Sequence, residues 1–369
     1  MKSIRVSLKE RSYSILIGKD IFSRLGLLIK DRYPKPRHVL VVTQKEIAVF
    51  YRDRAEKSLA CAEIEASFFV TPFSKSSEAA KSQNVYWRLI RQMAASSGKN
   101  KSLLLVALGG GVIGDLTGFA ASVYRRGVPY LQVPTTLTAQ VDSAIGGKTG
   151  IDLPEGKNLL GSIYQPALVL SDLSLLSSLP DRHWSDGFAE VIKYGVIKDT
   201  ALFLLLEKRG KEAIRTNPGF LEDVVFRCAK IKARIVEKDE FDKKDLRIAL
   251  NFGHTAGHAI EAASRFSRAY THGEALSIGM LIACEISLRL GYLKDPHLPM
   301  RLEKTLMKFK LPLFYKNIKT EALLKSMGHD KKSTSGVNRF VLPITLGKTC
   351  LVSDVPALVI REALEKRRG

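Results

Sequence analysis

The chain has 369 residues, of which 45% are hydrophobic and 26% are charged. This length and composition are ordinary for a globular protein that is large enough for two domains, each with its own core. The formal net charge of +21 favours an anionic partner or a basic surface of no specific purpose. Because Lys and Arg are spread along the chain, without an aromatic RNA-binding motif or a basic tail, nucleic acid is disfavoured as that partner.

No segment predicts a membrane span or secretion. The most apolar run, SLLLVALGGGVIGDLTGFAASVY, is interrupted by Asp115 and by several glycines, so it predicts a buried strand, a turn and a helix start. The N-terminal residues alternate like a strand and lack the long apolar stretch of a signal peptide. The four cysteines have no C-x-x-C spacing, which suits reduced thiols. We therefore expect a cytoplasmic protein that does not bind a membrane.

The first part of the chain alternates strand-like and helix-like segments. The predicted strands are short apolar runs that end in small or polar residues, at 38–43, 102–109, 130–136 and 166–172. Residues 77–98 have apolar positions at helical spacing. After about residue 180 the patterns favour helices, at 186–199, 221–240, 273–291 and 353–367. We predict an α/β domain at residues 1–178, followed by a mostly α-helical domain at residues 179–369.

A glycine-rich turn, LGGGVIGDLTGFAA, follows the strand at 102–109 and opens a helix. This is the setting in which glycines let backbone N–H groups approach a phosphate at a helix N-terminus. The spacing is not a clean G-x-G-x-x-G, and tight strand-to-helix turns use glycine without any nucleotide. Asp115, directly after the last of these glycines, suits either a nucleotide contact or a helix cap.

Residues 133–166 are dense in functional residue types. Their polar members lie among glycines and prolines, on what we predict to be irregular backbone after a strand: Thr135, Thr136, Asp142, Lys148, Lys157 and Asn158. Two Gly-Lys pairs in this stretch combine free backbone approach with a cation, which suits a phosphate group. The alternative is a solvated loop, and we favour the functional interpretation.

Three histidines lie close together in the sequence NFGHTAGHAIEAASRFSRAYTHGEA. His254 and His258 are four residues apart, on one face of a helix, but Thr255 stands where a zinc-protease helix carries glutamate. A catalytic zinc usually has three protein ligands, often two histidines and a carboxylate. The spacing leaves open which histidines bind and which carboxylate completes the set among Glu190, Glu261 and Glu274. The alternative is that these histidines cap helices or form hydrogen bonds in the core.

Together these stretches resemble the 3-dehydroquinate synthase family. The similarity is carried by GGGVIGD, RRGVPYLQVPTTLTAQVDSAIGGKTG, GKNLLGSIYQP, GFAEVIKYG, LRIALNFGHTAGHAIE, HGEALSIGM and DKKSTSGVNRFVLP, in the family's order. The resemblance implies a Rossmann-like NAD-binding domain followed by a helical metal-binding domain. It also implies conversion of 3-deoxy-D-arabino-heptulosonate 7-phosphate to 3-dehydroquinate and phosphate. The implied steps are transient oxidation by NAD+, phosphate elimination, re-reduction and an intramolecular aldol closure.

The same resemblance implies the site residues. One divalent metal, Zn²⁺ or Co²⁺, is bound by Glu190, His254 and His272, while His258 contacts substrate. The implied NAD+ set is Glu78, Lys81, Gly110, Gly111, Val112, Ile113, Gly114, Asp115, Thr135, Thr136, Lys148, Lys157 and Ser178. The implied catalytic and substrate set is Asp142, Lys148, Asn158, Lys193, Lys232, Arg247, Asn251, His258 and Lys331, with Arg126 serving the neighbouring subunit of a homodimer. Since Asn251 follows Arg247 by four residues, we expect one helix start to present metal and substrate contacts together.

Asp242 stands where the family usually has glutamate, which bears on substrate hydroxyl contacts. The nearest rival activity is a related cyclase acting on sedoheptulose 7-phosphate or glucose 6-phosphate, whose substrates lack the carboxylate. The residues Arg247, Asn251, His258 and Lys331 favour the dehydroquinate pattern over that rival. A polyol dehydrogenase of the same fold is disfavoured by the two Gly-Lys pairs, and a non-catalytic binding protein would be expected to have lost a metal ligand.

Overall fold

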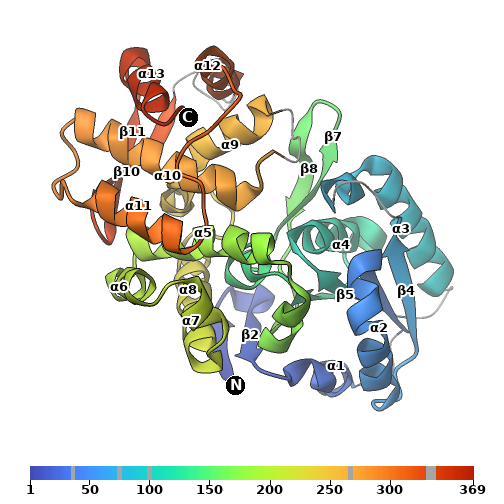
Figure 1. The fold of residues 1–369 in the computed structure, drawn as a ribbon. Helices are drawn as coiled ribbons and strands as arrows, with labels where there is room; N and C mark the ends of the chain where they lie inside the picture. Colours follow the sequence, from blue (N-terminus) through green and yellow to red (C-terminus); the bar gives the residue numbers. More distant parts are fainter. Residues whose placement is uncertain (35–37, 73–76, 98–101, 265–268, 330–337) are drawn as a thin grey trace. The chain divides into compact units, whose positions relative to one another are not determined.

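The computed structural model describes residues 1–34, 38–72, 77–97, 102–264, 269–329 and 338–369 (Figure 1). Their contacts divide the chain into two compact units. The first unit comprises Met1–Pro180 and Lys232–Phe241, and the second comprises Asp181–Ile231 and Asp242–Gly369. The predicted order of an α/β domain followed by a mostly helical domain is confirmed, while the domain limits at residues 178 and 179 stay a prediction.

The first unit is built on a seven-stranded sheet with the order β1-β2-β9-β6-β5-β3-β4. The strands are β1 (Lys2–Val6), β2 (Tyr13–Gly18), β3 (His38–Gln44), β4 (Ala66–Thr71), β5 (Leu103–Gly109), β6 (Tyr130–Pro134) and β9 (Leu168–Asp172). Only the edge pair β1–β2 is antiparallel, and the other neighbours are parallel. A parallel sheet buried on both faces produces uninterrupted apolar strands, which is why the sequence revealed β3 and β5.

Two hydrophobic cores lie on opposite faces of this sheet. The first core joins alternate strand residues such as Val39 and Val41 to α1 (Leu25–Arg32) and α2 (Lys45–Ala60). The second joins the intervening residues, such as Leu40, to α3 (Gln83–Ser97) and α4 (Gly111–Val123). The alternation follows from the two-residue period of a strand. Short helical turns complete the unit at Lys9–Arg11, Ile21–Arg24, Ser77–Lys81, Tyr124–Arg126, Ala139–Ser143 and Leu173–Ser178.

The stretch predicted to be irregular contains a hairpin instead. β7 (Lys148–Leu153) and β8 (Gly156–Ile163) pair antiparallel, with Gly150 opposite Gly161. A Cβ atom on Gly161 would lie 2.3 Å from the carbonyl oxygen of Thr149, so the two backbones approach more closely than side chains permit. The prediction was wrong because these glycines interrupt the side-chain alternation by which a strand is recognised.

The second unit is mostly helical. Its helices are α5 (Asp181–Ile197), α6 (Thr200–Arg209), α7 (Lys211–Arg215), most of α8 (Pro218–Lys238), α9 (His254–Ala263), α10 (His272–Arg289), α11 (Leu298–Lys308), α12 (Thr320–His329) and α13 (Ala357–Glu365). A two-stranded sheet of β10 (Arg339–Thr345) and β11 (Lys348–Ser353) accompanies them. The central helix is α10, which packs against α5, α9, α11 and β10 (Figure 1). Its residues are buried almost without interruption, as expected of a helix that is apolar all round.

The predicted single helix start at Arg247–His254 is wrong. Residues Leu246–Asn251 form a separate 3₁₀ helix, and α9 begins at His254. Gly253 separates the two segments at φ +80°, and a Cβ there would lie 2.8 Å from the backbone nitrogen of Met280. Left-handed backbone and close contact with α10 therefore both require glycine at this point.

Among the described residues, no helix has the length and apolarity needed to cross a membrane.

Candidate active site

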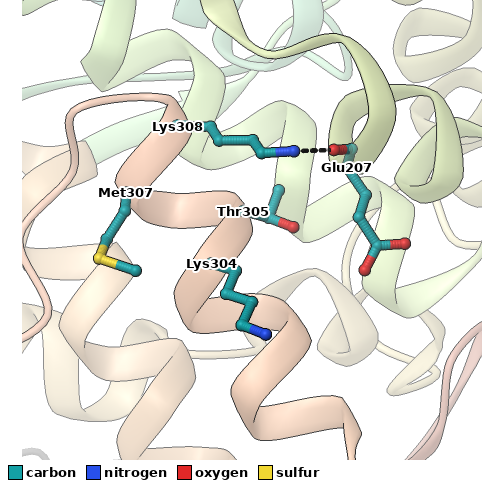
Figure 2. Close-up of a pocket in the computed structure, with 5 residues that line it drawn as sticks. All are labelled: Glu207, Lys304, Thr305, Met307 and Lys308. Atoms are coloured by element: carbon teal, nitrogen blue, oxygen red, sulfur yellow. Dashed lines mark hydrogen bonds between the residues drawn. The ribbon is translucent and has the colours of Figure 1, made fainter.

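A hollow of about 470 Å³ lies beside α6 and α11, but it does not gather reactive groups (Figure 2). Its lining consists of Glu207, Lys304, Thr305, Met307 and Lys308, none of which the sequence singled out. Glu207 forms an ion pair with Arg301 at 2.8 Å, and Lys308 donates a hydrogen bond to the carbonyl oxygen of Glu207. These contacts join two helices, and the hollow is a surface feature of their packing.

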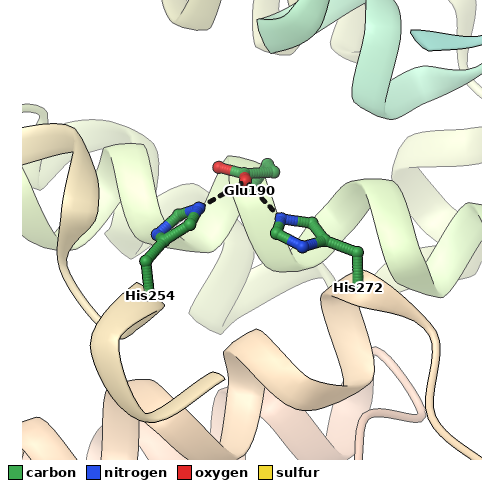
Figure 3. A group of neighbouring side chains, drawn as sticks. All are labelled: Glu190, His254 and His272. Carbon is green, nitrogen blue, oxygen red and sulfur yellow. Dashed lines mark hydrogen bonds and ion pairs between the residues drawn. The ribbon is translucent and has the colours of Figure 1, made fainter. Parts of the chain in front are cut away.

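A metal-ligand arrangement lies instead within the second unit, where three helices bring their side chains together (Figure 3). Glu190 comes from the middle of α5, while His254 and His272 are the first residues of α9 and α10. The Nε2 atoms of His254 and His272 lie 3.4 Å and 3.1 Å from the same oxygen, Oε1 of Glu190. Glu190 is only 1% exposed. The three residues that the resemblance implied as ligands are thus side by side.

The second ring nitrogen of each histidine faces an acceptor. His254 Nδ1 lies 3.3 Å from the carbonyl oxygen of Phe252, and His272 Nδ1 lies 3.3 Å from Oε2 of Glu261. A neutral imidazole whose Nδ1 donates to such an acceptor has only a lone pair at Nε2. Two lone pairs and one carboxylate oxygen then converge, and this arrangement is stabilised by a cation. These side chains therefore fit a divalent metal, with oriented Nδ1 groups as metal-ligating histidines usually have.

Burial and the neighbouring charges set the ionisation of these three side chains. Burial alone would raise the pKa of Glu190, but Lys193 and the two histidines outweigh it and hold that pKa well below its ordinary value. Burial lowers the pKa of His254, and nearby Lys193 lowers it further. Burial opposes a charge on His272 as well, yet its hydrogen bonds to Glu190 and Glu261 raise its pKa well above the ordinary value. Glu190 is thus a carboxylate, and His254 is a neutral nitrogen ligand.

Lys193 completes the inner polar group from one turn further along α5. Its Nζ lies 2.5 Å from Oε2 of Glu190, and both side chains are 2% exposed. That oxygen forms an ion pair without a hydrogen bond among the described residues. Burying two charges is favourable only when each has a partner, so Lys193 and Glu190 depend on one another.

His258, Glu261 and His272 form a second group of possible ligands. The ring of His258 lies 5.2 Å from that of His254, centre to centre, and His258 is exposed. Both groups share His272, whose Nε2 faces Glu190 and whose Nδ1 faces Glu261. The buried group is the better metal site because its carboxylate is desolvated and is shared by two imidazoles.

The glycine-rich turn lies in the first unit, where Gly110 precedes α4 as its N-cap residue. A Cβ on Gly110 would lie 3.0 Å from Thr136, and one on Gly111 would lie 2.8 Å from the Ser143 hydroxyl. Gly114 packs in the same way against Gln132 on β6, at 2.7 Å. Close packing of the turn on β6 and on the segment that follows β6 thus requires these glycines. Val112 is half-buried, and Ile113 is in the core.

Predicted cofactor residues from three segments meet beside this turn. Lys81 is 3% exposed, and its Nζ donates to Asp115 at 2.9 Å. The same ammonium donates to Oδ1 of Asn158 and lies 3.9 Å from Glu78. Lys157 lies 3.8 Å from that same Glu78 carboxylate. Asp115 does not cap α4, whose N-cap is Gly110 without a side-chain hydrogen bond, and its alternative role as a ligand contact stays a prediction.

Threonine and serine hydroxyls follow the neighbouring strands β6 and β9. Thr135 is buried, and its hydroxyl has no hydrogen-bond partner among the described residues. Such an orphaned group, beside the glycine-rich turn, fits a bound dinucleotide. Ser178 contacts the Tyr51 hydroxyl at 2.8 Å, and Tyr51 also donates to the carbonyl oxygen of Leu175. Sequence reasoning missed Tyr51, since no local pattern connects α2 to the segment after β9.

The remaining predicted substrate residues are distributed over both units. In the first unit, Lys232 donates to Asp142 twice, to Oδ1 at 2.9 Å and to the backbone oxygen at 2.8 Å. Lys148 begins β7, and Arg126 is an exposed residue at φ +61°. In the second unit, Arg247 is buried, whereas Asn251 and His258 are exposed. Lys331 lies outside the described residues.

Two family models match the chain over most of its length. Residues 72–186 match the family model described as 3-dehydroquinate synthase N-terminal, and residues 187–333 match the one described as 3-dehydroquinate synthase C-terminal. A 3-dehydroquinate synthase of Symbiobacterium thermophilum is 40% identical, over 98% of this chain and 100% of the relative. Another, of Pelobacter propionicus, is 41% identical, over 97% of each chain.

Solved structures share the fold. The 2-epi-5-epi-valiolone synthase of Streptomyces hygroscopicus subsp. jinggangensis, with NAD+ and Zn²⁺ bound, has a TM-score of 0.87 and 28% identity over 98% of both chains. A 2-deoxy-scyllo-inosose synthase, solved with carbaglucose-6-phosphate, NAD+ and Co²⁺, has a TM-score of 0.86 and 23% identity over 99% of this chain and 100% of that one. At that identity the second match is informative about the fold alone.

Proposed function

Since this chain belongs to the 3-dehydroquinate synthase family, we propose that it is a phosphate-eliminating lyase that converts 3-deoxy-D-arabino-heptulosonate 7-phosphate into 3-dehydroquinate and phosphate. The observation that supports this most directly is the convergence of Glu190, His254 and His272, with both Nε2 atoms within 3.4 Å of one carboxylate oxygen. A centre of two histidines and one carboxylate leaves coordination positions for substrate oxygens.

The chain's own residues hold two groups in this proposal. When bound, NAD+ supplies a reversible hydride acceptor, and Zn²⁺ or Co²⁺ supplies a Lewis acid. Glu190, His254 and His272 bind the metal, and the ammonium of Lys193, 2.5 Å from Glu190, supplies positive charge next to it. The glycine turn, together with the ion-paired Lys81 and Asp115, holds the dinucleotide in the first unit.

The substrate carries a carboxylate and a phosphate, so it calls for several cations. The candidate cations in this chain are Lys148, Lys193, Lys232, Arg247 and Lys331. Lys232 is held in place by two contacts with Asp142, and a lysine oriented in this way loses less side-chain entropy when an anion binds. In this proposal His258, which is exposed one turn after His254, contacts substrate and is not a metal ligand; its exposure supports that role.

We also propose that the protein acts in the cytoplasm as a homodimer. None of the four cysteines, all of which the structure describes, forms a disulfide, which suits a reducing compartment. Arg126 is exposed and held at φ +61°, next to Arg125 at φ +50°, and the family resemblance assigns it to the partner's phosphate site. Light scattering combined with size-exclusion chromatography tests the dimer. A monomer with full activity would contradict the role of Arg126.

A phosphate-release assay tests the proposed reaction. Purified protein with NAD+ and Zn²⁺ or Co²⁺ is expected to release phosphate from the heptulosonate phosphate without net accumulation of NADH. Sedoheptulose 7-phosphate and glucose 6-phosphate serve as competing substrates. Phosphate release from either of these, and none from the heptulosonate phosphate, would refute the assignment.

Paired variants test the proposed ligand set. His254→Ala is expected to lose bound metal, whereas His258→Ala, the matched change one turn along α9, should retain it and lose turnover. Metal content is measured by atomic emission after dialysis. Loss of metal from His258→Ala would transfer the site to the second group of ligands.

A further inference from the structure

Glu261 has a contact that the proposed function leaves unused. We propose that Glu261 is a positioning residue of the metal centre, whose carboxylate accepts the Nδ1–H of His272 and so presents Nε2 of that ring to the metal. The inference rests on the proposed function only in taking the metal to be bound by Glu190, His254 and His272.

The first support is the geometry of His272, whose ring lies between two carboxylates. Nε2 lies 3.1 Å from Oε1 of Glu190, and Nδ1 lies 3.3 Å from Oε2 of Glu261. The two ring nitrogens thus have separate partners on opposite sides of the ring. A metal at Nε2 leaves the single proton of the neutral imidazole at Nδ1, and that N–H donates a hydrogen bond to Glu261.

The second support is the difference between the two histidine ligands. His254 receives its Nδ1 acceptor from the backbone, through the carbonyl oxygen of Phe252 two residues before it. For His272, the acceptor is a side chain from another helix. A backbone acceptor is supplied by the fold whatever the side chains are, whereas the orientation of His272 depends on one replaceable residue.

The third support is the placement of Glu261 on α9. It follows His254 by seven residues, which is two helical turns, so the two side chains share one face. A single helix therefore supplies one metal ligand and the orienting partner of another. The Glu261 side chain is 14% exposed, so water competes weakly for the hydrogen bond that it accepts.

The competing arrangement makes Glu261 a metal ligand together with His258 and His272. Their ligand atoms also lie within 4.8 Å of one another. In that arrangement the metal would occupy Nδ1 of His272, and Glu261 would need a negative charge to bind it. As an acceptor of Nδ1–H, by contrast, Glu261 needs only an oxygen, which glutamine also provides. This difference separates the two roles.

The test measures Zn²⁺ affinity by competition with a chromophoric chelator, together with the visible absorption of the Co²⁺-loaded protein. Glu261→Ala is expected to weaken Zn²⁺ binding by about 10–100-fold, the usual effect of losing a partner that orients a ligand. Glu261→Gln should recover most of that affinity and keep the parent's Co²⁺ bands. Glu321→Ala, which removes a glutamate paired with Arg361 on the surface of the same unit, controls for the loss of one negative charge.

Three results decide the proposal. Loss in Glu261→Ala, recovery in Glu261→Gln and no change in Glu321→Ala would support it. Unchanged affinity in Glu261→Ala, or a glutamine variant as defective as Glu190→Gln, would overturn it. Glu261→Met, which keeps a long helix-favouring side chain without an acceptor, replaces the alanine variant if that one does not fold. Because no substrate is present, failure of the proposed reaction leaves these readouts unaffected.

Discussion

The buried pair of Glu190 and Lys193 allows one prediction to be worked out in detail. Glu190→Gln keeps the size of the side chain and removes its charge, so Lys193, 1% exposed, loses the carboxylate that lies 2.5 Å from its ammonium. Removing one member of a buried ion pair typically costs about 3–5 kcal/mol. For a unit of this size each kcal/mol lowers the unfolding temperature by about 2–4 °C, so a decrease of about 6–20 °C is expected.

Metal binding would obscure this loss, so unfolding is followed calorimetrically in the presence of EDTA. The double variant Glu190→Gln/Lys193→Met removes both charges and should regain most of the stability, because an apolar pair of similar volume is often as stable as the ion pair. Lys193→Met alone should cost less than Glu190→Gln, since His272 still faces the remaining carboxylate at 3.1 Å. Two results would refute this reasoning: Glu190→Gln unfolding within about 2 °C of the parent, or a double variant that is no more stable than Glu190→Gln. Either would mean that the two charges do not depend on each other.

Three further predictions concern other parts of the molecule. In the metal-free centre the pKa of His272 is raised well above its ordinary value, so a metal that binds this ring must displace a proton. Zn²⁺ affinity should therefore increase with pH, which chelator competition between pH 6 and 8 would show. A pH-independent affinity would contradict this prediction. Tyr51→Phe removes a hydroxyl 2.8 Å from Ser178 and from a backbone oxygen, and it should cost about 1–3 kcal/mol of stability and weaken NAD+ binding, measured by urea unfolding and by calorimetric titration. Unaltered NAD+ affinity in this variant would remove Ser178 from the cofactor site. A Cβ on Gly279 would lie 2.1 Å from the carbonyl oxygen of Gly253, just before α9. Gly279→Ala should therefore destabilise the protein by about 1–3 kcal/mol or more and reduce its metal content. Normal metal content in a folded variant would contradict the close approach of α10 to α9.

Much of the fold was predictable because burial leaves a strong pattern. The strands at His38–Gln44 and Leu103–Gly109 are covered on both faces, and uninterrupted apolar runs announce them. The hairpin at Lys148–Ile163 was missed because the close approach of Gly150 and Gly161 takes the place of alternating side chains. The segment before α9 was wrongly joined to that helix because the break depends on the left-handed backbone of Gly253, where α10 passes.

The metal centre shows most clearly what the sequence determines and what the tertiary structure adds. By itself the sequence determined the residue types, three histidines and several carboxylates in the second half of the chain, and its motifs placed them in a known family. Spacing along one helix made His254 and His258 the obvious pair, because residues four apart share a face.

The family resemblance implied which groups bind the metal, and the tertiary structure is what makes them meet. It brings Glu190 on α5 to His272 on α10, 82 residues further along the chain. It also turns Nδ1 of each ligating histidine toward an acceptor, a carbonyl oxygen for His254 and Glu261 for His272. Local spacing could not reveal this, because the direction of an imidazole ring is set by its hydrogen-bond partners, and for His272 these come from two other helices.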